Sequence, residues 1–224
     1  MAEAPSPRPT APASAVDAAV DRSLSERRAT AVAEVARLIE AALTVIQRTG
    51  ELEPKVGEIV REAGLHNQAF YRHFRSKHEL LAAVLDHGIA VLASYVAGRM
   101  DEAATPEARV RAWLAGVLEQ ALHPGAADAT RPFALARGRL AEVCPDEVRE
   151  SERRLTALVQ SAIEAGRDAG AFPAASPERD AELLYALAMG FVERELARGA
   201  SPLREDAARL EAFALAGLAR NGGA

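Results

Sequence analysis

The segment from His66 to His78 gathers side chains that can hydrogen-bond to nucleic acid. Asparagine and glutamine can pair with adenine through two hydrogen bonds, and arginine can pair with guanine in the same way. Tyrosine and histidine can donate to phosphate oxygens. Full positive charges stand at Arg72, Arg75 and Lys77, and no acidic residue falls between His66 and His78. In a chain of net charge −5 this is a local basic segment, which is the electrostatic feature that a specific DNA reader needs.

Two short apolar patches around a glycine predict how these side chains are positioned. Residues 55–63 and 66–74 each have one apolar face, and Gly64 lies between them, where a left-handed residue ends a helix at little cost. Two short helices across a tight turn form a helix-turn-helix. Their apolar faces would pack on a preceding helix that carries Val32 to Ile46, which leaves the donor side chains outward. The predicted DNA-binding residues are Lys55, His66, Asn67, Gln68, Tyr71, Arg72, His73 and Lys77.

The rest of the chain has the periodicity and end signals of successive helices. Two capping boxes, each a serine followed three residues later by a glutamate, predict helix starts at Ser23 and Ser76. A hydroxyl residue before a proline, or a proline after Cys144, marks further first turns. These further starts fall at Thr105, Pro145, Ser176 and Ser201. We therefore predict an all-α protein of about nine helices, with the segment 123–132, which holds Pro, Gly and Asp, as a loop.

Length and composition bound the domain organisation. The chain has 224 residues, of which 49% are hydrophobic and 26% charged, an ordinary globular balance. We divide it into a flexible tail (1–22), a helix-turn-helix domain (23–75) and a helical ligand-binding and dimerisation domain (76–224). The first residues do not have the basic and apolar regions of a signal peptide, and no apolar run approaches the ~20 residues that cross a bilayer. We expect a cytoplasmic protein without membrane contact.

Several residues have both a structural and a functional interpretation. Cys144, the single cysteine, is interpreted as structural, with a redox switch as the alternative. The histidines between 66 and 78 are seven and five residues apart and do not share a helix face, so no metal site is expected. Arg131, Arg137 and Arg139 are either solvated or paired with an anionic effector group. The motifs of hydrolases, phosphate loops and zinc proteases are absent from the sequence, so we predict no enzyme, no catalytic residue and no cofactor.

The helix-turn-helix carries a family resemblance. The run Ile59-Val-Arg-Glu-Ala-Gly-Leu65 is followed by Tyr71-Arg-His-Phe-Arg-Ser-Lys-His-Glu-Leu80, and over about residues 25–92 the chain resembles the tetracycline-repressor (TetR) family. The resemblance implies about nine helices, the first three forming the DNA-binding domain. It also implies a homodimer built largely through the last two helices, and a ligand pocket in the larger domain whose occupation releases DNA.

We therefore predict a ligand-responsive transcriptional repressor that binds palindromic operator DNA. Two other classes stay open: a helical protein-interaction module without DNA binding, which the basic outward face disfavours, and, more remotely, a helical enzyme. The partners expected are double-stranded operator DNA, a small-molecule effector and a second copy of the chain.

The larger domain supplies candidates for the effector and the dimer. Large side chains at helical spacing usually form the core, and an incomplete core is also a pocket. The predicted ligand-binding residues are Tyr95, Trp113, Phe133, Arg137, Tyr185 and Met189. The predicted effector is a mainly hydrophobic small molecule. Two apolar stripes favour a two-fold dimer over burial within one protomer; they comprise Leu183, Leu184, Leu187, Phe191 and Leu196, and Leu210, Phe213, Ala214 and Gly217.

Overall fold

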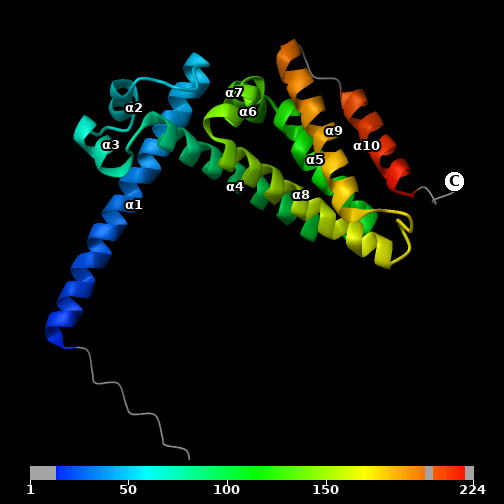
Figure 1. Ribbon diagram of the computed structural model, residues 1–224, viewed down its shortest axis with the longest axis horizontal. Helices are drawn as coiled ribbons and strands as arrows, with labels where there is room; N and C mark the ends of the chain where they lie inside the picture. Colours follow the sequence, from blue (N-terminus) through cyan, green and yellow to red (C-terminus); the bar gives the residue numbers. More distant parts are fainter. Residues whose placement is uncertain (1–13, 200–203, 220–224) are drawn as a thin grey trace, which may run out of the picture.

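The protein is built from α-helices, as shown by a computed structural model that describes residues 14–199 and 204–219 (Figure 1). The helices are α1 (Ala15–Thr49), α2 (Val56–Glu62), α3 (Asn67–His73), α4 (Lys77–Asp101), α5 (Pro106–Leu122), α6 (Pro124–Leu135), α7 (Arg137–Val143), α8 (Pro145–Asp168), α9 (Pro177–Arg198) and α10 (Arg204–Ala219). Within these described ranges no strand occurs. The predicted all-α class is confirmed, with ten helices in the described part of the chain where about nine were expected.

Helix α1 begins at Ala15 rather than at Ser23. The Ser14 hydroxyl accepts a hydrogen bond from the backbone N–H of Asp17 at 3.2 Å, and the Asp17 carboxylate accepts one from the Ser14 N–H at 3.0 Å. This reciprocal pair is a capping box, so the start predicted at Ser23 is wrong. Residues 15–22 of the expected tail belong to the helix, and residues 1–13 lie outside the described residues. The first half of α1 extends beyond the other helices (Figure 1).

Most of the other predicted helix starts are confirmed. The hydroxyls of Ser76 and Thr105 accept hydrogen bonds from backbone N–H groups three residues later, at 3.1 and 3.2 Å. Pro145 lies in the first turn of α8. Ser176 precedes α9, but its hydroxyl makes no capping bond. The start predicted at Ser201 lies outside the described residues.

Residues 124–132 are helical, which corrects the loop predicted over 123–132. They form most of α6, with Pro124 in the first turn, where a missing N–H costs no helical hydrogen bond. Pro132 lies inside the helix and removes one such bond. Ala127 and Ala134 are buried in the larger apolar core, so tertiary packing holds a helix that its composition alone disfavours.

Two apolar cores hold the helices together. The smaller core joins α1, α2, α3 and the start of α4 around Phe70, which is fully buried, and it also includes Leu140 and Cys144. The larger core surrounds Trp113, which is also fully buried and whose indole N–H donates to the Leu155 carbonyl at 2.9 Å. Because Leu140 comes from α7, the small core contains part of the region assigned to the larger domain.

Helix α4 links the two cores. It packs against α1 at one end and against α5 and α8 along its length. By length and composition alone, α4 is apolar enough to cross a membrane, which corrects the expectation that no run approaches that length. One such helix is weak support for a membrane protein, and here α4 connects the small core around α1, α2 and α3 with the larger core.

Candidate nucleic-acid interface

The turn between α2 and α3 depends on Gly64. Its φ is +60°, and a Cβ at this position would lie 3.1 Å from the Arg37 guanidinium. Glycine therefore meets both a backbone and a space requirement here. The Leu65 N–H donates to the Val60 carbonyl at 2.8 Å and closes the turn. Arg37 donates to the carbonyls of Ala63 and Gly64, the latter at 3.1 Å, so α1 holds the turn directly.

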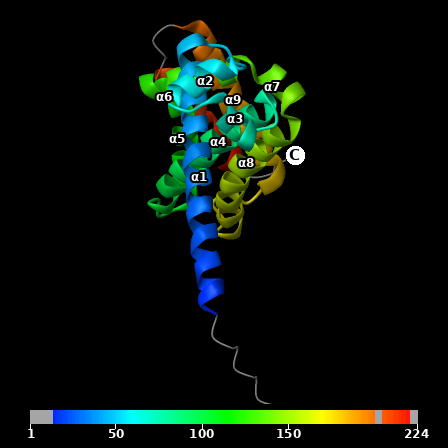
Figure 2. The same cartoon turned by 90° about the vertical axis from the view of Figure 1, so that its left-hand side faces the viewer.

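Helix α3 buries one side and exposes the other, as the sequence predicts. Ala69 and Phe70 lie in the small core, and the Phe70 ring meets the Tyr71 ring edge-on at 5.2 Å between centroids. The exposed residues of the predicted set are Lys55, His66, Asn67, Gln68, Tyr71 and Arg72. Helices α2 and α3 form one end of the molecule, remote from α9 and α10, and Figure 2 views that end directly. An accessible, donor-rich surface results.

Two members of the predicted set contact α1 instead of pointing freely outward. The His73 imidazole Nε2 lies 2.6 Å from the Glu34 carboxylate, and its side chain is only 10% exposed. Arg72 reaches the same carboxylate oxygen at 3.3 Å while staying 58% exposed. The hydrogen bond from His73, helped by the charge of Arg72, holds the pKa of Glu34 below its ordinary value. His73 therefore does not belong to the outward face, which corrects its predicted role.

Lys77, in the first turn of α4, is partly engaged by Glu53. Its ammonium lies 3.4 Å from the Glu53 carbonyl and 3.8 Å from the Glu53 carboxylate, and it remains 40% exposed. Arg139 of α7 donates to the same carboxylate at 2.6 Å, and this hydrogen bond is the main cause that lowers the pKa of Glu53. Glu53 thus joins the helix-turn-helix to α7. Lys77 keeps enough exposure to meet a phosphate.

Sequence reasoning missed the residues that hold α3 in place. The segment 66–78 is free of acids along the chain, yet folding brings Glu34 and Glu53 against it. A signal existed for Glu34 and Arg37, because they are one turn apart on α1 beside Leu38, a fully buried residue. Polar residues that flank a packing face are candidates for contacts with the neighbouring helix. Glu53 stands between α1 and α2 and gives no such signal.

The predicted effector-binding residues are spread through the larger domain. Tyr95 is exposed and donates to Glu119, whereas Trp113 is fully buried in the larger core. Phe133 is partly buried against the small core, and Met189 against the larger one. These four side chains do not converge, so they do not outline one pocket.

Arg137 and Tyr185, the other two candidates, do lie together. The Arg137 guanidinium stacks over the Tyr185 ring at 5.5 Å and forms ion pairs with Glu152 at 2.6 Å and Glu193 at 3.0 Å. Burial raises the pKa of Tyr185 to about 12. Arg137 is therefore already paired with two carboxylates. An anionic ligand would have to compete with both of them.

The two neighbouring arginines are also engaged within the chain. Arg131 of α6 donates to the carbonyl of Leu196 in α9, and Arg139 pairs with Glu53. Neither is a simply solvated side chain. Both tie the region of α6 and α7 to another part of the molecule.

Cys144 lies buried at the end of α7. Burial is the main cause that raises the pKa of its thiol. Because the thiolate is the reactive form, this environment favours the structural interpretation of Cys144 over the redox switch.

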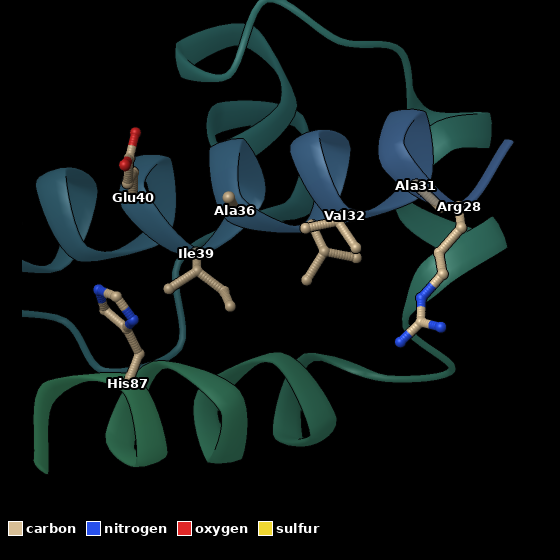
Figure 3. Close-up of a pocket in the computed structure, with 8 residues that line it drawn as sticks. Arg28, Ala31, Val32, Ala36, Ile39, Glu40 and His87 are labelled. Carbon is tan, nitrogen blue, oxygen red and sulfur yellow. The ribbon is translucent and has the colours of Figure 1, made fainter. Parts of the chain in front are cut away.

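Surface hollows occur away from these candidates. One of about 360 Å³ opens where α1 and α4 diverge, with Val32 and Ile39 on its wall, Arg28 at one end and His87 at the other (Figure 3). A second hollow, of about 630 Å³, lies between the end of α1 and α6. A third, of about 620 Å³, lies between α9 and α10. None of the six predicted effector residues lines these three hollows.

Comparison with known proteins agrees with the helix-turn-helix. Residues 38–84 match the sequence model of "Bacterial regulatory proteins, tetR family". A stretch of 75 residues is 37% identical to the HTH-type transcriptional regulator BetI of Rhizobium meliloti and covers 34% of this chain. That match spans 37% of the length of the relative.

Solved structures extend the likeness to most of the chain. A TetR transcription regulator from Haloarcula marismortui has a TM-score of 0.71 at 19% identity and covers 83% of this chain and 97% of its own. The transcriptional regulator FadR from Bacillus subtilis, in complex with stearoyl-CoA, has a TM-score of 0.70 at 13% identity and covers 81% and 98%. At such identities the likeness concerns the fold.

The fold and the interface together define the class: an all-α protein with an N-terminal helix-turn-helix domain. Within that class, residues 38–84 match the helix-turn-helix of the TetR family in sequence, and the chain resembles solved TetR-family regulators in fold. The relatives and structural neighbours named above are transcriptional regulators, not enzymes.

Proposed function

We propose that the chain is a dimeric transcriptional repressor that binds palindromic operator DNA through α2 and α3 and releases it when a small molecule binds. The observation that carries this proposal is the outward face of α3. Asn67, Gln68 and Tyr71 are exposed there, directly beside the fully buried Phe70 that anchors the helix.

Each exposed residue has a role that its chemistry suits. Asn67 and Gln68 offer the paired donor and acceptor that recognise adenine, and Arg72 offers the fork that recognises guanine. Tyr71 and Lys77 suit phosphate contacts, which fix the position of a protein on DNA without reading sequence. Lys55 and His66, both exposed, extend the phosphate-facing surface on either side of the turn.

The second copy of the chain would dock on α9 and α10. Leu183 is 67% exposed, Leu187 37% and Phe213 71%, and a hollow of about 620 Å³ lies between the two helices. Other residues of the predicted stripes, among them Leu184 and Leu196, are buried within the protomer. The exposed remainder is an apolar surface of the kind that protein contacts cover, and a two-fold axis there would present two copies of α3 to successive half-sites.

The proposed effector is a mainly hydrophobic small molecule, with one polar or anionic end, and it acts in the cytoplasm where the operator lies. One structural relative was solved with stearoyl-CoA, which joins a long hydrophobic acyl chain to an anionic coenzyme A group. Binding in the larger domain would tilt α4, whose first turn carries Lys77. A coupling of about 1–3 kcal/mol is typical of such systems and gives a 5–150-fold loss of operator affinity.

The experiment measures binding of the full chain to the DNA upstream of its own gene by fluorescence anisotropy. A scrambled duplex of equal length is the control, and tight binding to the first duplex only is expected. Stearoyl-CoA and a neutral hydrophobic molecule are then titrated into the complex. Equal affinity for both duplexes would exclude operator recognition and favour a protein-interaction module.

A further inference from the structure

Helix α3 is held at both ends by α1. Arg37 donates to the two carbonyls of the turn just before α3, and Glu34, one helical turn earlier on α1, pairs with Arg72 and His73 at the end of α3. A helix of seven residues has little stability of its own. The orientation of α3, and of the side chains on it, therefore depends on these contacts.

We propose that Glu34 is a positioning residue that sets the sequence preference of DNA binding by acting through Arg72. The inference rests on the proposed function, since it concerns how that same interface tells one sequence from another. Glu34 would make no contact with DNA. It restrains Arg72 and offsets part of its charge, so that Arg72 contributes to reading a base more than to general attraction for phosphate.

The Glu34 carboxylate that restrains Arg72 is itself held by His73. The Glu34 side chain is 17% exposed and its carboxylate is anchored by His73, which is 10% exposed, at 2.6 Å. Arg72 meets the same oxygen at 3.3 Å from a side chain that is 58% exposed. The carboxylate is thus held by a histidine that is mostly buried, and the arginine is held by the carboxylate. A guanidinium has five N–H donors, so a single bond to Glu34 leaves most of the fork available.

The expected consequence follows from how arginine binds DNA. An unrestrained arginine on an exposed surface is attracted to the phosphates of DNA of any sequence. This electrostatic attraction dominates non-specific binding. Recognition of guanine instead requires two hydrogen bonds in a defined direction. A nearby carboxylate lowers the attraction of the arginine to phosphates. By limiting the rotamers of the arginine, it also favours the directed hydrogen bonds to guanine.

The test compares Glu34→Gln and Glu34→Ala with the wild-type chain on the operator and on a scrambled duplex, over a series of salt concentrations. Glutamine keeps an acceptor for His73 while removing the charge that restrains Arg72. Both variants should bind the scrambled duplex more tightly, with a salt dependence steeper by about one counterion. The ratio of operator to scrambled affinity should fall by roughly 5–150-fold, the worth of one bidentate base contact.

Matched variants separate positioning from simple support of the fold. Glu40→Gln removes an exposed carboxylate from the same helix and should leave the ratio unchanged. In an Arg72→Ala background, Glu34→Gln should have no further effect on discrimination, because its influence passes through Arg72. Circular dichroism melting checks that each variant is folded.

Two results with the variants would overturn the inference alone, and one result with the wild type would overturn it together with the proposed function. A purely structural role would weaken binding to both duplexes equally and lower the melting temperature. An unchanged affinity ratio in folded Glu34→Gln would exclude any positioning role. If the wild-type chain itself does not distinguish the two duplexes, the proposed function fails together with this inference, whereas a discriminating wild type with equally discriminating variants overturns the inference alone.

Discussion

The DNA-binding end and the larger helical domain are built from the same kind of helix but concentrate function differently. At the DNA-binding end, a buried face of α3 fixes which residues are exposed, so the candidate contacts fall on adjacent positions of one short helix. In the larger domain the candidates Tyr95, Trp113 and Met189 lie on separate helices at different depths. A surface site follows from local pattern, whereas an internal site depends on how several helices meet.

The largest effect is expected at the proposed dimer interface. This interface lies in the larger domain, but the DNA-binding end depends on it because operator binding needs two copies of α3. Phe213→Arg would place a charge in an apolar contact, where an unpaired charge is costly. The side chain is 71% exposed in the protomer, so folding should be retained. Light scattering should show monomers, and operator affinity should fall by about 10²–10⁴-fold as the second half-site is lost. Ala208→Arg, on an exposed part of α10, is the control; persistent dimers of the Phe213 variant would place the interface elsewhere.

A pair of glycine substitutions should sharpen the contrast in backbone requirements. Gly64→Ala forces a side chain into a φ of +60° beside Arg37 and should destabilise the protein by about 1–2 kcal/mol. Gly98→Ala, inside α4 with open space around it, should instead stabilise by about 0.5–1 kcal/mol. Urea unfolding measures both. A neutral Gly64→Ala would mean that the turn does not need glycine.

Effector binding should be visible in the larger domain through Trp113, the single tryptophan of the chain. Its indole N–H bonds to Leu155 of α8, so a shift between α5 and α8 changes its surroundings. Titration with stearoyl-CoA should change its emission over the concentrations that release DNA. Bound operator must weaken the ligand by the same factor, because coupling is reciprocal at equilibrium. Release of DNA without that reciprocal loss would contradict the two-state mechanism.

The smallest effect concerns the acid dependence of the DNA-binding end. The pKa of Glu34 is lowered by its hydrogen bond from His73, so its ionised form favours the folded state. That contribution is complete above the ordinary glutamate pKa of about 4.3 and is lost as the pH falls through the lowered value. Glu34→Gln should therefore differ from the wild type in urea stability at pH 7 and differ less at pH 3.5. A constant difference at both pH values would show that the carboxylate charge has no part in stability.

Sequence patterns predicted the local features of this protein far better than its long-range contacts. The glycine turn, the buried Phe70 and the exposed face of α3 are short-range consequences of periodicity, and the structure confirms them. The loop expected at 123–132 is helical because distant residues bury Ala127 and Ala134. His73 turns inward because it hydrogen-bonds with Glu34, which is 39 residues away in sequence. Such contacts form only when the helices pack, and a single sequence carries no direct signal of them.

The central claim is that the outward face of α3 reads DNA, and a base-substitution scan of the operator with the Gln68→Ala variant tests it most directly. The wild-type chain should bind the operator about 10³-fold or more tightly than a scrambled duplex. The variant should lose ~1–3 kcal/mol of preference at one base pair in each half-site and keep its preference at the others. An unchanged preference at every position, with tight binding retained, would contradict the assignment of α3 as the helix that reads the operator.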